Sequence, residues 1–197
     1  MFASGLVFTE DGDMSGPLHT LKHEHRVIER NLRALDGICA RLTWGEHVPV
    51  DVLIKLVDFI SGYTDGFHHL KEETYLFPAL MRQSVSRHDG VLRLIEQEHE
   101  NERQLSAEMR KAIEGYKGVD PDSRRRFVDA ARRYSDLLLP HLEHEETILF
   151  RLADDMLDEN ETDFLREAFK HAAAEFGVER LAAYEQMAVE QEEAWGI

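Results

Sequence analysis

The sequence lacks several features that would assign it to common classes of protein. It has a single cysteine, Cys39, which excludes an internal disulfide framework and fits a reducing compartment such as the cytoplasm. No run of about 18 apolar residues occurs, so we expect no transmembrane helix. Residues 1–16 carry acidic groups but no basic cluster, which is unlike a signal peptide.

Positive charge is also scarce. The chain has 23 Lys and Arg against 39 Asp and Glu, a formal net charge of -16. Such a charge repels phosphate backbones and anionic lipids, so we expect neither a nucleic-acid partner nor binding to a membrane surface. Residues 154–197 hold 13 of the acidic and 3 of the basic residues, so the excess belongs mainly to the C-terminal segment.

Strand-like alternation is missing as well, and apolar residues recur instead with the period of a helix. The pattern predicts an all-α fold, an antiparallel up-down four-helix bundle over 17–157 with short connections. A flexible tail, 1–16, precedes the bundle, and an acidic segment, 158–197, adds a C-terminal helix packed on it. The expected helices are 17–43, 48–83, 88–116, 121–157 and 161–194. Pro78 and Pro140 lie inside two of these and are expected to kink or loosen them.

What the sequence does have is histidine, 11 residues in all, and part of this set lies in an internal repeat. Residues 68–77 resemble residues 141–150, and Glu24-His25 resembles Glu98-His99. The first expected helix therefore pairs with the third, and the second with the fourth. A bundle built in this way has a pseudo-two-fold axis, on which the repeated side chains converge.

Helical-wheel positions place these histidines inside the bundle. His25, His99 and His141 each lie within an apolar stripe. His68 lies on a less uniform face, and the stronger apolar face of its helix, which includes Phe59, points elsewhere. We therefore expect the helix of His68 to be covered on two sides, by the bundle and by the C-terminal helix or a partner subunit.

Two glutamates, Glu72 and Glu145, each follow an inward histidine by one helical turn. A buried, ionised carboxylate is costly unless it is paired or binds a metal, and His-x-x-x-Glu places both groups on one face. Four imidazoles with two carboxylates fit a non-haem iron pair, with manganese as the competing metal. Zinc usually takes fewer ligands, and calcium takes oxygen ligands only.

The residues in 24–30, 68–80, 98–100 and 141–150 resemble the hemerythrin-like family, also called HHE cation-binding domains. The resemblance implies two iron ions bridged by the two glutamates and by water, hydroxide or oxo. The metal ligands that it implies are His25, His68, Glu72, His99, His141 and Glu145.

One position departs from the oxygen-carrying hemerythrins, which place a second histidine one turn before the ligand of the third helix. Here that position is Ile95. His144 is the first candidate to replace the missing ligand, although it lies 60° from His141 on the wheel, at the fringe of the inward stripe. We expect His69 and Glu73 to support the ligands rather than bind metal, and Glu29 is a candidate to orient His25.

The remaining residues of interest have simpler interpretations. Tyr75 and Tyr134 are expected to pack in the core, and Cys39 to be a buried, inert thiol. His88 lies about 16 Å from His99 by helical rise, too far to share its metal. Four histidines without a partner pattern are expected to be exposed, namely His19, His23, His47 and His171.

These residues lead to three hypotheses of function. In the first, the iron pair binds or senses a small ligand, oxygen or nitric oxide, or the protein stores iron. In the second, it is an enzyme acting on peroxide or nitric oxide, or an iron donor for iron–sulfur cluster repair, with an external partner for any repeated reduction. In the third, the chain is a metal-free interaction bundle, or a homodimer formed through 48–83 and the C-terminal helix.

Overall fold

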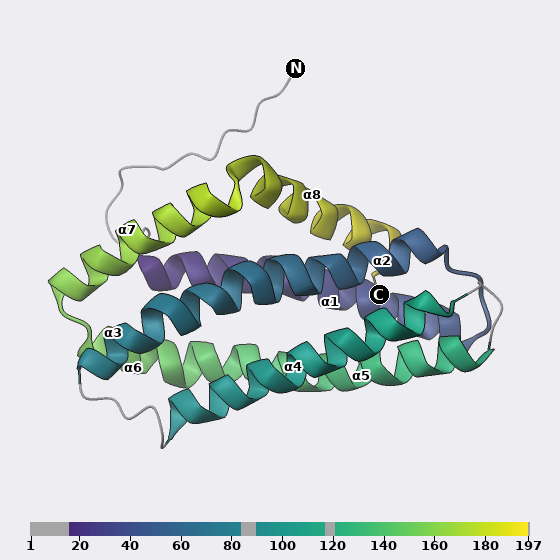
Figure 1. Cartoon of the computed structure of the whole chain (residues 1–197), viewed down its shortest axis with the longest axis horizontal. Coiled ribbons are helices and arrows are strands. Elements are labelled where there is room, and N and C mark those ends of the chain that lie inside the picture. The colour runs from purple at the N-terminus through teal and green to yellow at the C-terminus, as the bar shows by residue number, and fades with distance from the viewer. Residues whose placement is uncertain (1–15, 84–89, 117–120, 197) are drawn as a thin grey trace.

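The computed structural model describes residues 16–83, 90–116 and 121–196, which form six helical rods and contain no strand. The predicted all-α class and helical bundle are confirmed. Four rods lie along one another as the bundle, and the last two form a bent pair that runs along one side of it (Figure 1). The bundle consists of α1 (Pro17–Thr43), α2 to α3 (Val50–Arg82), α4 (Val91–Glu114) and α5 to α6 (Pro121–Met156). The start of the third predicted helix, with His88, and the tail 1–15 lie outside the described residues.

The second and fourth rods are not α-helical throughout. Wider π-helical turns interrupt them, and in two places the turn begins at a predicted ligand, Glu72 or Glu145. In these turns the N–H of Phe77 donates to the carbonyl of Glu72, and the N–H of Phe150 donates to that of Glu145. The rods are continuous through both prolines, and such π turns are frequent at functional sites. The π segments are η1 (Ile60–His69), η2 (Glu72–Leu76) and η3 (Glu145–Leu149), between α2 (Val50–Phe59), α3 (Phe77–Arg82), α5 (Pro121–His144) and α6 (Phe150–Met156).

The C-terminal segment differs from the single helix expected over 161–194. It forms two helices, α7 (Glu159–Phe176) and α8 (Val178–Trp195), which meet at a sharp bend above the bundle (Figure 1). Gly177 between them has a φ of 100°, a conformation that strains any residue with a Cβ. The bend directs α8 onto α1, along which the chain continues toward the same end of the bundle (Figure 1).

Two glycines show how closely α8 packs on the bundle. A Cβ built on Gly37 of α1 would lie 1.8 Å from the carbonyl oxygen of Trp195, and one on Gly62 would lie 2.1 Å from the hydroxyl of Tyr184. Phe59 and Tyr63 also contact the ring of Tyr184. The second rod is therefore covered on its outer side by the C-terminal helices, as its second apolar face predicts.

The apolar core is divided into two clusters of buried side chains. Leu21 belongs to the smaller cluster and Ile28 to the larger one, and both are fully buried in α1. His25 lies between them in sequence, so the predicted ligands occupy the level of the bundle where the apolar core is interrupted. Among the described residues, no helix has the length and apolar character needed to span a membrane.

Candidate metal centre

Side chains from all four rods of the bundle meet at this interruption. One group of potential ligand atoms comes from His25, His68, Glu72 and Glu145, all buried, with every atom within 4.8 Å of the others. A second buried group comes from His69, His99 and His141. The structure thus brings together all six residues predicted from the sequence, and it adds His69.

Glu145 lies between the two groups. Its Oε2 is 3.2 Å from Nε2 of His25, and its Oε1 is 3.3 Å from Nε2 of His141 and 3.6 Å from Nε2 of His99. Two ligand atoms that share one ion at about 2.1 Å are themselves about 3.0–3.4 Å apart. One carboxylate oxygen therefore faces each group, which is the arrangement of a bridging ligand.

Glu72 reaches the same two groups from the second rod. Its Oε2 lies 3.8 Å from Nε2 of His68 and 3.6 Å from Nε2 of His99. Glu72 and Glu145 also occupy equivalent positions in the internal repeat, each at the first residue of a π turn. The pseudo-two-fold arrangement predicted from the sequence is present in the pair of carboxylates.

The atoms that face this centre have no hydrogen-bond partner in the protein. Buried polar atoms in folded proteins are nearly always hydrogen-bonded, so a cluster of unpartnered ones needs an explanation. A bound cation supplies it, because lone pairs directed at a metal cannot also accept hydrogen bonds. The unpartnered atoms are Nε2 of His25, His68, His99 and His141 and both carboxylate oxygens of Glu72 and Glu145.

The opposite nitrogen of each of these imidazoles is held by a carboxylate. Such a carboxylate keeps the proton on Nδ1 and leaves the lone pair of Nε2 free to bind a metal. The same four glutamates are the sequence neighbours of predicted ligands on other rods. The pairs are His25 with Glu146 at 3.0 Å, His68 with Glu24 at 2.8 Å, His99 with Glu73 at 2.8 Å and His141 with Glu98 at 2.9 Å.

Three of these supporting glutamates contact a basic side chain in turn. Glu146 accepts from Arg26 at 2.8 Å, and Glu73 accepts from Arg103 at 2.5 Å. Glu24 accepts from Lys71, which is buried against the rings of Phe67 and of Phe169 in α7. The fourth, Glu98, lies 3.6 Å from Nδ1 of His144.

Burial and mutual charge set the protonation of the two bridging carboxylates. Burial, together with the negative charge of Glu145, raises the pKa of Glu72 well above its ordinary value. Burial also opposes ionisation of Glu145, but the positive charge of His141 and the contacts with the surrounding imidazoles hold the pKa of Glu145 well below its ordinary value. Without a metal, the two carboxylates therefore hold protons with very different strength.

The pKa values of the ligand imidazoles also differ from one another. Burial opposes protonation of His141, but the charges of Glu145 and Glu102 raise its pKa well above the ordinary value. The pKa values of His25 and His99 are also raised, because their contacts with carboxylates outweigh burial. Burial lowers the pKa of His68 to about 4. The metal-free centre thus retains protons that a cation must displace.

The sequence indicated His144 as the candidate for the missing ligand and His69 as a support, but it is His69 that lies within a group of potential ligands. His69 belongs to the second group and its ring stacks on that of His99, with centroids 3.9 Å apart and planes 13° apart. His144 belongs to neither group, and its side chain is 41% exposed beside Glu98. Ile95 is fully buried in the smaller apolar cluster. The additional histidine beside His99 and His141 is therefore His69, on the second rod.

Glu102 was not recognised from the sequence. It is 2% exposed, neither of its carboxylate oxygens has a hydrogen-bond partner, and Oε2 lies 3.5 Å from Nε2 of His69. Burial raises the pKa of Glu102 to about 7. Its spacing of three residues after His99, on the same face of α4, is the signal that identifies it.

Several minor predictions can also be compared with the structure. Glu73 supports His99 as expected, but Glu29 contacts Arg26 and no histidine. Tyr134 and Cys39 are buried, and burial raises the pKa of the thiol to about 12. The four histidines expected at the surface are all exposed, namely His19, His23, His47 and His171.

Residues 16–153 of the chain match the family described as hemerythrin HHE cation binding domain. The chain belongs to this family. The match covers the four rods of the bundle and every residue of the two ligand groups, so the hemerythrin-like resemblance is confirmed. The centre of this hemerythrin-like chain is accordingly a cation-binding centre built from buried His and Glu side chains.

Curated relatives of this hemerythrin-like chain are distant. Uncharacterized proteins of Mycobacterium tuberculosis and Mycobacterium bovis are 23% identical to it over 150 residues, which is 76% of this chain and 58% of each relative. The chain therefore spans little more than half the length of the relatives that it matches. No solved structure is significantly similar to it.

Proposed function

We propose that this hemerythrin-like chain is a non-haem diiron protein that binds or senses a small ligand, oxygen or nitric oxide, at an iron pair in the bundle core. The supporting observation is the set of buried imidazole and carboxylate atoms that face one centre without a partner. Glu72 and Glu145 lie between two groups of histidines, which favours two adjacent ions over one.

The residues fit iron better than the other common cations. His25 and His68 would hold the first ion, and His99 and His141 the second, with both glutamates shared between them. Mixed imidazole and carboxylate ligands suit iron or manganese, whereas calcium selects oxygen alone and a zinc site has about four ligands. When bound, the iron pair would supply Lewis acidity and the capacity to change oxidation state.

The side chains around the centre would orient the ligands and cover the site. The supporting glutamates fix each imidazole in the tautomer that presents Nε2. The ring of Phe150 stacks on His25 with centroids 5.3 Å apart and covers that side of the first group. On this proposal His69, rather than His144, takes the place beside the second ion where Ile95 offers no ligand.

Turnover of peroxide at the same centre is a second candidate function. Glu102 favours it, because a buried carboxyl group beside the second group of histidines can hold a proton close to a bound molecule. Binding of a small molecule and turnover of peroxide would use the same metal-binding residues. They would differ in whether the bound molecule is released unchanged or converted.

Metal analysis and two variants test the ligand assignment. The protein is expected to bind about two iron ions per chain, and His68→Ala and Glu145→Ala are each expected to lose at least one. Glu29→Ala is the matched control, because Glu29 contacts no histidine. Full metal content in both variants would contradict the assignment.

Spectroscopy of the iron-loaded protein separates the two candidate functions. Ligand binding predicts a spectrum that forms with oxygen or nitric oxide and reverses when the gas is removed. Turnover predicts bleaching together with consumption of added peroxide. An iron-loaded protein that responds to none of these molecules would contradict both functions while leaving the metal centre intact.

A further inference from the structure

A cavity of about 190 Å³ lies beside the second group of histidines. Its walls come from η1, α4 and α5, so it opens between the second rod and the pair formed by the third and fourth. The lining includes the side chains of Asp65, His69, Glu102, Arg103, Arg110 and Tyr134. None of them belongs to the six ligands implied by the family resemblance.

The lining changes from exposed to buried along the cavity. Arg110 is 46% exposed and Arg103 33% exposed, whereas Glu102 is 2% exposed and His69 is 1% exposed. The arginines therefore form the mouth, and the imidazole and the carboxyl group form the inner end. A passage of this kind connects the surface to the interior of the bundle.

The inner end is polar and unsatisfied by the protein itself. Both ring nitrogens of His69, both carboxylate oxygens of Glu102 and the hydroxyl of Tyr134 have no hydrogen-bond partner. Unpartnered polar atoms in an interior are rare, and a space large enough for several water-sized molecules can satisfy them only with polar contents. The cavity is therefore suited to small molecules that form hydrogen bonds.

The inner end also adjoins the metal centre. Oε1 of Glu102 lies 3.9 Å from Nδ1 of His141, and the ring of His69 lies 3.9 Å from that of His99. His69 is itself a member of the second group, so a molecule at the inner end lies against that group.

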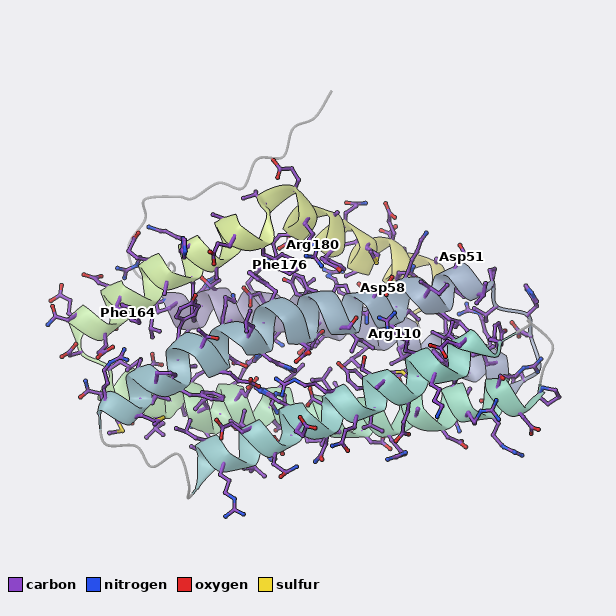
Figure 2. The ribbon with its side chains drawn as sticks, in the orientation of Figure 1. Asp51, Asp58, Arg110, Phe164, Phe176 and Arg180 are labelled. Atoms are coloured by element: carbon purple, nitrogen blue, oxygen red, sulfur yellow. The ribbon has the colours of Figure 1, made fainter. Side chains whose placement is uncertain are left out.

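The mouth does not carry the negative charge of the chain as a whole. Arg110 donates to Asp58 at 2.9 Å, and Arg103 donates both to Asp65 at 2.6 Å and to Glu73 at 2.5 Å, so the two guanidinium groups offset part of the acidic charge at the rim. Figure 2 shows Asp58 and Arg110 side by side in the space between α2 and α4. These positive charges weaken, at the mouth, the repulsion of small anions that the formal charge of -16 produces elsewhere.

We propose that this cavity is the port through which a small, hydrogen-bonding molecule of two or three heavy atoms reaches the second metal position, with Glu102 and His69 as the groups that it meets there. This inference rests on the proposed diiron centre and adds the route and the chemical class of the ligand. The polar inner end suits peroxide, the substrate of the second candidate function, better than oxygen or nitric oxide.

Azide, a small anion that binds ferric iron and gives an absorbing complex, is the probe for the test. The iron-loaded protein is mixed with azide in a stopped-flow instrument, and the association and dissociation rates are measured. Ser106→Leu narrows the cavity from within, and Ala107→Trp covers its exposed rim. Gln104→Trp on the exposed face of α4 is the matched control, because Gln104 does not line this cavity.

Blocking a port slows the association and the dissociation of azide by the same factor. We therefore expect either blocking variant to lower both rates at least tenfold, to leave the dissociation constant of azide within twofold, and to keep full iron content. The control should bind azide at the wild-type rate. Ala107→Trp keeps the test valid if Ser106→Leu does not fold.

Three results would count against these ideas, and they are distinguishable. Unchanged azide rates in both blocking variants at full iron content would overturn the port and leave the diiron centre standing. Slower iron uptake with unchanged azide rates would make the cavity a route for the metal instead. A wild-type protein that binds no iron would refute the proposed function itself.

Discussion

The hydrogen bond between Glu98 and His141 allows a direct test of how the centre is held. Glu98 accepts from Nδ1 of His141 at 2.9 Å and, among the described residues, it otherwise contacts only His144, at 3.6 Å. Replacing Glu98 by alanine therefore removes the support of one ligand imidazole and leaves that ligand in place. It also leaves no buried cation unpaired, as replacing Glu24 would, because Glu24 is bonded to the buried Lys71.

The size of the effect follows from the role of such a support. Removing a carboxylate behind a ligand imidazole typically lowers metal affinity about 10- to 100-fold, which is roughly 1.4–2.8 kcal/mol. Glu98→Gln keeps an oxygen acceptor but loses its charge. Since hydrogen bonds with an ionised partner are roughly twice as strong as neutral ones, we expect a smaller loss, about tenfold or less.

Competition with a chelator of known affinity measures both variants against the wild type. Glu29→Ala is the control and should match the wild type, because Glu29 pairs with Arg26 on the outside of α1. Helix content by circular dichroism shows whether each variant is folded. If folded Glu98→Ala bound metal within twofold of the wild type, Glu98 would not be orienting His141.

Three further predictions concern other parts of the molecule. His69→Ala should lower the metal content and His144→Ala should not, and equal content in both by metal analysis would remove His69 from the second position. Gly62→Ala places a Cβ 2.1 Å from the hydroxyl of Tyr184 and should lower the free energy of unfolding by about 1–3 kcal/mol in thermal or denaturant unfolding, whereas Gly16→Ala, with nothing within 4 Å, should be neutral. Three ligand imidazoles have raised pKa values without metal, so they stay protonated over a wider pH range and a cation must expel their protons. Metal affinity should therefore rise with pH, with proton release measurable by calorimetry in buffers of different ionisation enthalpy, and a constant affinity from about pH 6 to 8 would contradict this.

Much of the fold follows from the sequence because the helical period is strong and the connections are short. The first helix, expected at 17–43, is observed as Pro17–Thr43, with a proline in its first turn. The break at Gly177 was missed because an isolated glycine within a helical pattern is usually tolerated. Only the contacts that α8 makes on α1 and η1 decide that the chain bends toward the bundle there.

His25, His99 and His141 could be found because each lies on the inward stripe of its helix, whereas His68 and the two glutamates followed from the internal repeat and the His-x-x-x-Glu spacing. Their supports were harder to recognise, because a residue next to an inward ligand points toward the neighbouring helix, as Glu24 and Glu98 do. The direction of the His69 side chain could not be predicted for a different reason. His69 ends the π segment η1, where the turn is wider, so a rotation of 100° per residue no longer gives the direction of its side chain.

The four glutamates that hold the ligand imidazoles link the four rods of the bundle in chain order. Glu24 of the first rod holds the ligand of the second, Glu73 holds that of the third, Glu98 that of the fourth, and Glu146 closes the ring on His25. Sliding any rod by one turn would displace its own ligand and release that of the next rod. The ring of imidazoles and carboxylates thus fixes the register of all four rods together, because no rod can complete it alone.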